Sequence, residues 1–140
     1  MNMLVSTAIV GTAIPATAAQ TDPAFAAIAK KKAADIAHIK AIEHTDSFPV
    51  RFPRSEACWA AWDAQAEACD YASQIDWELA TTKPASLAGI AAVLRFVNEI
   101  EDGGDEWPNS DEIGADGWHY QLRKTMAAAI EAIIHRNASI

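Results

Sequence analysis

Apolar residues recur at three- and four-residue steps along most of the chain, a pattern that predicts amphipathic α-helices. The first such segment begins at Asp22, which can cap the amides of a first turn, and Pro23, which suits the first helical position. It ends near His44. We expect its apolar stripe to face the core, opposite Lys31 and Asp35. The stripe consists of Phe25, Ile28, Ala29, Ile36, Ile39 and Ile42.

A second helix is predicted from Ser55 to about Ala80, after an extended connection over Asp46 to Arg54 that contains two prolines. One side has a heptad-like apolar seam, formed by Trp59, Trp62, Ala66, Cys69 and Ser73. Acidic residues lie away from that seam, at Glu56, Asp63, Glu67, Asp70 and Asp76. The spacing therefore predicts a helix with tryptophans packed on one face and water on the other.

Pro84 interrupts the helical pattern between Thr81 and Ser86, and a third helix follows. Its expected stripe is Leu87, Ile90, Ala91, Leu94 and Val97. Gly89 lies in its second turn, where glycine costs about 1 kcal/mol relative to alanine. We therefore expect a neighbouring helix to approach closely at Gly89.

The third helix is expected to stop at Asp102-Gly103-Gly104, before an irregular acidic segment that runs to Gly117. A final helix is predicted from near Asp116 to about Asn137. Its apolar side is Trp118, Leu122, Met126, Ala129, Ile130, Ile133 and Ile134.

These elements predict an all-α fold, a three- to four-helix antiparallel bundle formed by residues 20–140 as one domain. The composition agrees, because alanine is abundant while glycine and proline number six each. Completion of the bundle by dimerisation, through the Trp59/Trp62 face or the Trp118 face, stays open as an alternative.

Residues 1–19 contain no charged side chain and end in the small residues Ala16 to Ala19, which is typical of a signal peptide. Only the α-amino group supplies positive charge before the apolar stretch. Two explanations for the missing positive charge stay open. Either the true start of the protein lies upstream, or the segment is an apolar tail that is not exported. A membrane anchor is not expected, because polar residues interrupt a stretch shorter than the ~20 residues that span a bilayer.

The segment from Thr81 to Arg95, TTKPASLAGIAAVLR, resembles a motif of uncharacterised small bacterial proteins that begin with an export-like leader. Their order of segments is similar, with Asp-Pro-x-Phe-Ala-Ala-Ile after the leader, here Asp22 to Ile28, and a helix at the C-terminus. The resemblance covers most of the chain loosely, and TTxPxSLAG is its distinctive part. It implies a helical fold and a leader, and it implies no catalytic residue.

The formal net charge of −8 disfavours nucleic acid and anionic membranes as partners. The one basic run, Lys30 to Lys32, is interpreted as a solvated helix face.

Cys58 and Cys69 are eleven residues apart on one predicted helix, about 16 Å along its axis, whereas a disulfide allows about 7 Å between Cα atoms. We expect free thiols, with intermolecular bonds between copies as the alternative.

Metal binding has only weak signals, and we expect no metal or other cofactor. Two pairs have helical spacing, Asp35 with His38 and Glu131 with His135, but the Glu-x-x-His pattern on two helices is absent. The irregular segment is rich in oxygen ligands without matching the EF-hand spacing. Its candidate ligands are Asp105, Glu106, Asn109, Asp111, Glu112 and Asp116.

The tryptophans are the strongest candidates for a binding surface. Trp59 and Trp62 form an i,i+3 pair, Trp107 stands in a polar loop before a proline, and Trp118 opens the last helix. Core packing is the ordinary alternative for the pair, and burial is an equal alternative for Trp107.

No nucleophile–base signature, phosphate loop or pair of catalytic carboxylates is present, so we do not expect an enzyme. The sequence favours an exported, periplasmic interaction or structural protein, whose partner is an unidentified protein or a second copy. Two alternatives stay open. One is a metal-dependent, enzyme-like protein that uses His38, His119 and His135, and the other is a cytoplasmic, phage-derived helical protein.

Overall fold

A computed structural model describes residues 22–50 and 54–139, and the predicted leader and the phenylalanine and proline at 52 and 53 lie outside these ranges. The described residues form α2 (Pro23–Asp46), α3 (Glu56–Thr81), α4 (Leu87–Asp102) and α5 (Trp118–Ala138), with no strand among them. The all-α helical bundle is therefore confirmed. None of these helices has the length and apolarity needed to cross a membrane.

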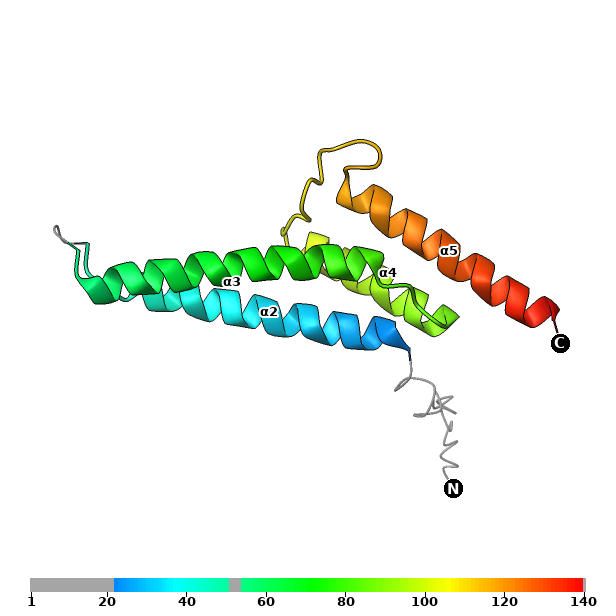
Figure 1. Ribbon diagram of the computed structural model, residues 1–140, viewed down its shortest axis with the longest axis horizontal. Helices are drawn as coiled ribbons and strands as arrows, with labels where there is room; N and C mark the ends of the chain where they lie inside the picture. Colours follow the sequence, from blue (N-terminus) through cyan, green and yellow to red (C-terminus); the bar gives the residue numbers. More distant parts are fainter. Residues whose placement is uncertain (1–21, 51–53, 140) are drawn as a thin grey trace, which may run out of the picture.

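Helices α2 and α3 form a long antiparallel hairpin, with α4 and α5 against one half of it (Figure 1). We call the half with Pro23 and Thr81 the proximal half and the half with Asp46 and Glu56 the distal half. The hairpin seam is rich in alanine at alternating three- and four-residue steps, which lets the helix axes approach closely. Its buried residues include Ala24, Ala27, Lys31, Ala34 and Thr45 of α2 and Cys58, Ala61, Ala72, Ile75 and Leu79 of α3.

The predicted faces of both hairpin helices are wrong in their distal halves. Ile36 and Ile39 are 53% and 54% exposed, and Trp59 and Trp62 are 52% and 46% exposed. Ala66, Cys69 and Ser73 of the predicted seam are exposed as well. The seam residues are small, so the bulkier isoleucines and tryptophans dominated the sequence pattern although they lie beside the contact.

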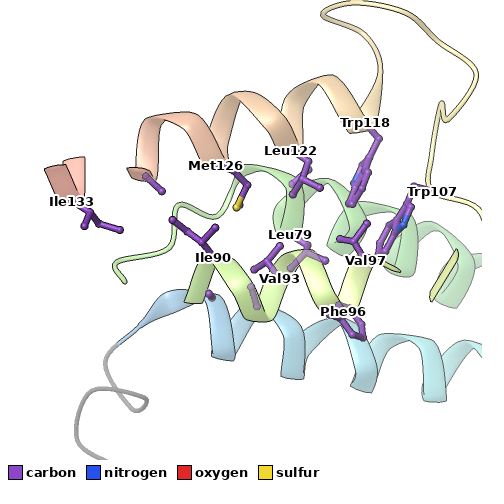
Figure 2. Close-up of a cluster of buried hydrophobic side chains, with 14 residues drawn as sticks. Leu79, Ile90, Val93, Phe96, Val97, Trp107, Trp118, Leu122, Met126 and Ile133 are labelled. Carbon is purple, nitrogen blue, oxygen red and sulfur yellow. The ribbon is translucent and has the colours of Figure 1, made fainter. Parts of the chain in front are cut away.

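The main core lies where α4 and α5 meet the proximal half of the hairpin (Figure 2). On α4, Ile90 and Val97 are buried as predicted, together with Val93 and Phe96. The predicted α5 stripe is confirmed in its larger part, by buried Trp118, Leu122, Met126, Ala129 and Ile133. Five residues of these two predicted stripes are exposed instead, namely Leu87, Ala91, Leu94, Ile130 and Ile134.

Asp22 joins the start of α2 to the turn before α4. Its Oδ1 accepts hydrogen bonds from the Ala24 and Ala85 amides at 3.0 and 3.1 Å, and its Oδ2 accepts one from Ser86 Oγ at 2.5 Å. A Cβ at position 89 would stand 2.2 Å from Asp22 Oδ2. A close approach at Gly89 is present as expected, but the group that makes it is the Asp22 carboxylate at the cap of α2 and not the body of a crossing helix. The segments DPxF and TTxPxSLAG therefore meet in space.

Candidate interaction site

The distal half of the hairpin has an uncovered face on the side where α4 covers the proximal half (Figure 1). Phe25 and Ile28 of α2 line one shallow hollow together with Phe96 of α4. Ile39 and Ile42 follow four turns after them at helical spacing, so they belong to the same side of α2. Among residues 22–50 and 54–139, no helix covers this side at that level, so Ile39 is in contact with solvent and Ile42 is partly so.

A groove of about 580 Å³ runs along this face, between the exposed sides of α2 and α3. We call it the hairpin groove. Ile100 of α4 and the segment from Asp105 to Trp107 line its proximal end. Its remaining lining residues come from both hairpin helices, namely Lys31, Asp35, His38, Ile39, Ile42, Cys69, Ala72, Ser73 and Asp76.

An aromatic and cationic cluster lies near the tip of the hairpin. The Trp59 and Trp62 rings meet edge to face, with centroids 6.4 Å apart. The Arg54 guanidinium lies 4.3 Å from the Trp62 centroid and 5.6 Å from that of Trp59. Trp62 also lines a small hollow of about 150 Å³ with Phe48. Exposed tryptophans beside an arginine are the residue types that anchor protein interfaces.

Trp107 and Trp118 do not form part of an exposed surface. They are 3% and 0% exposed, and their rings stack with centroids 4.0 Å apart and planes 5° apart (Figure 2). Trp118 Nε1 donates a 2.7 Å hydrogen bond to the Asp76 carbonyl. Both are core residues, so neither ring is exposed to a partner, and for Trp107 the alternative of burial is the one that the structure shows. The polar neighbours of Trp107 in sequence concealed that its loop folds back onto α5.

A buried ion cluster lies at the proximal end of the groove. Lys31 Nζ lies 2.5 Å from Asp35 Oδ1 and 2.6 Å from Asp76 Oδ1, and it stands 5.5 Å from the Trp107 centroid. Lys31 and Asp76 were both expected on solvated faces, and both are buried. That expectation is wrong, because each charged group finds an opposite charge inside the hairpin and so tolerates burial.

Burial and pairing act in opposite directions on this cluster. Burial alone would lower the pKa of Lys31, but hydrogen bonds with Asp35 and Asp76 raise it above its usual value. Burial raises the pKa of Asp76, and the attraction of Lys31 offsets this only in part while Asp35 adds repulsion. The positive charge of Lys31 is therefore neutralised by Asp35 and Asp76 within the cluster.

The histidines proposed as metal ligands lie in different surroundings. His38 lines the hairpin groove with Asp35, whereas His119 Nε2 lies 3.3 Å from Glu101 Oε1 and His135 is in the last turn of α5. Within residues 22–50 and 54–139, no three histidine, cysteine or acidic side chains gather in a way that could hold a metal ion.

The acidic segment before α5 is held in place by hydrogen bonds within the segment itself. Asn109 adopts a left-handed conformation with φ of 49°, and its side-chain amide donates a 3.2 Å hydrogen bond to the Asp116 carbonyl. Cys58 and Cys69 lie on the same continuous helix, α3, and are both free, the first buried and the second exposed.

No family model matches the chain. No curated protein and no solved structure shows significant similarity to it. The geometry of the hairpin groove therefore provides the basis for a functional proposal.

Proposed function

We propose that this protein is an interaction module that binds a helix of another polypeptide in the hairpin groove. The observation that supports the proposal is the uncovered distal face, where Ile39, Trp59 and Trp62 are each about half exposed. Single exposed apolar residues are ordinary on protein surfaces, but several large ones on one half of a hairpin, with Ile39 in the groove and Trp62 in the hollow near the tip, are typical of a binding surface.

Helix α4 indicates what such a groove accepts. Its buried side chains, Ile90, Val93, Phe96 and Val97, follow helical spacing and pack against the proximal half of the hairpin. A helix of a partner placed beyond Ile100 would continue this row along the distal half. Helix-in-groove binding uses the same spacing of anchors, at i, i+3, i+4 and i+7.

Chemistry on a substrate has less support from the same groove. Cys69 and His38 both line it, yet no hydrogen bond among the described residues joins the thiol to the imidazole. A cysteine nucleophile needs a base or a cation that favours its thiolate. We therefore propose a binding role for this chain and no catalytic one.

We also propose that the chain is exported to the periplasm and that residues 1–19 are removed. The support is the uncharged apolar stretch that ends in small residues. Sequencing the N-terminus of the protein from its host tests this. A start at Ala19 or Gln20 is expected, and an intact Met1 would contradict it.

Photo-crosslinking in the host tests the binding role. Ala66 and Ala64 are both exposed and lie two residues apart on α3. Their side chains therefore project from nearly opposite sides of the helix. Benzoylphenylalanine at position 66 should give one discrete adduct, and the same probe at position 64 should not. Adducts from neither position, or equal adducts from both, would contradict the proposal.

A further inference from the structure

We propose, on the basis of the binding role above, that the occupant of the hairpin groove is a basic amphipathic helix of about three turns from another protein. The groove rather than a single residue carries this inference, because its length, its floor and its charge each restrict the occupant. The net charge of −8 on each chain disfavours a second copy as the occupant.

The length of the groove sets the length of the occupant. Lys31 and Ile42 mark its extent along α2, a separation of about 16 Å at 1.5 Å per residue, which corresponds to about three turns of a docked helix. The segment from Asp105 to Trp107 closes the proximal end. The occupant therefore abuts that segment and extends toward the hairpin tip.

The floor of the groove has an apolar part, which Ile39, Ile42 and Ala72 line. These side chains come from two antiparallel helices and leave a furrow between them. A helix fills such a furrow with one stripe of aliphatic side chains and keeps its other face in water. The occupant is thus amphipathic.

The charge of the groove is negative at its closed end. Asp35, Asp76, Asp105 and Glu106 line it together with a single lysine, Lys31, which already pairs with the first two carboxylates. Asp105 and Glu106 are exposed and take part in none of the ion pairs of the described residues. Lysine or arginine side chains of a partner would complete this end of the site.

A second copy that docked through the same groove would bring the same carboxylates to the contact. Each chain has a formal net charge of −8, so the encounter of two copies is repulsive overall, and a positively charged partner is attracted. Apolar contact in the furrow and attraction at the rim act together for a basic helix from another protein, without the repulsion between two chains of the same net charge.

A synthetic probe tests the inference with the full chain. The probe is a fluorescein-labelled 14-residue peptide of leucine and lysine, with leucine at i, i+3, i+4 and i+7, and binding is measured by fluorescence anisotropy. The double variant Asp105→Asn/Glu106→Gln should bind about fivefold more weakly, since each exposed ion pair contributes up to about 1 kcal/mol. The matched control Asp111→Asn/Glu112→Gln removes the same charge from outside the groove and should bind as wild type.

A second pair of variants tests the apolar floor. Ile39 and Ile36 are 54% and 53% exposed, but only Ile39 lines the groove. Ile39→Ser should weaken peptide binding about fivefold, because about 1 kcal/mol of apolar contact is lost, whereas Ile36→Ser should leave it within twofold. Similar stabilities of the two variants are expected, as both side chains are half exposed.

Two results would overturn the inference. One is equal weakening by the groove variants and their controls, which would make the attraction non-specific. The other is a dimer in light scattering that Ile39→Ser dissociates and Ile36→Ser does not, which would make a second copy the occupant. If crosslinks form from position 66 while the peptide fails to bind, the binding role stands and this inference alone falls.

Discussion

Asp22 shows how one residue connects two segments that are far apart in sequence. Its carboxylate caps α2 and also accepts from Ala85 and Ser86, so the start of α2 is tied to the turn before α4. Gly89 is required beside it, since any larger residue would meet this carboxylate. Packing and capping therefore account for Asp22, Ser86 and Gly89 at these positions.

The Asp22→Asn variant should be destabilised by about 1–2 kcal/mol, because a buried charge-assisted network loses its strongest acceptor. Burial alone would raise the pKa of Asp22, but hydrogen bonds from Ser86, Ala24 and Ala85 lower it below 3.8. A lowered pKa contributes stability above pH 3.8 that is lost as the pH falls through the folded value. The difference in the free energy of unfolding between wild type and variant, measured with urea, should shrink below pH 3.8. A difference that stays constant with pH would contradict this prediction.

Lys31 offers a second residue-level prediction. Lys31→Met should destabilise the protein by about 3 kcal/mol at neutral pH, since Asp76 is left buried and unpaired. Because the pKa of Lys31 is raised in the folded protein, the contribution of Lys31 to the free energy of unfolding persists below pH 10.5. This contribution is lost as the pH rises through the pKa of Lys31 in the folded state.

The pH profile of that variant provides the check. Burial already raises the pKa of Asp76, and removal of Lys31 raises it further. The variant should regain stability as the pH is lowered and Asp76 is protonated. The double variant Lys31→Met/Asp76→Leu should recover most of the loss in urea unfolding, and no recovery would contradict a paired cluster.

At the scale of the elements, helix positions follow from the sequence and helix faces follow only in part. Capping residues and breakers placed the helices correctly, as Asp22, Ser55 and Ser86 show. The faces of α2 and α3 were mistaken because an alanine seam has little hydrophobic contrast. Pairing of Lys31 with Asp76 could not be predicted either, since the two residues belong to different helices and only the i,i+4 spacing to Asp35 was visible.

The alanine seam makes a prediction of its own. Ala34 is 2% exposed in the seam, while the adjacent Ala33 is exposed. Ala34→Leu should destabilise the protein by about 1–3 kcal/mol, because the added volume forces α2 and α3 apart. Ala33→Leu should change stability by less than about 0.5 kcal/mol in the same thermal unfolding experiment. Equal effects would show that the seam lies elsewhere.

At the scale of the molecule, the bundle is complete on its proximal half and open on its distal half. Trp59 and Trp62 are exposed, which agrees with the prediction of a surface for a partner and not with the packed seam, and their role in binding stays a proposal. The closed end was not foreseen, because Asp105 and Glu106 reach the groove through a loop whose path has no periodic signal.

The central claim is that the distal face is open in the isolated chain and covered by a partner in the host. Cys69 lies in the groove and is exposed, while Cys58 is buried and serves as the internal reference. The rate of maleimide labelling at Cys69 should be high in the purified chain and several-fold lower in undisturbed host extract. Equal rates in both, or a Cys69 that is already protected in dilute purified protein, would contradict the account.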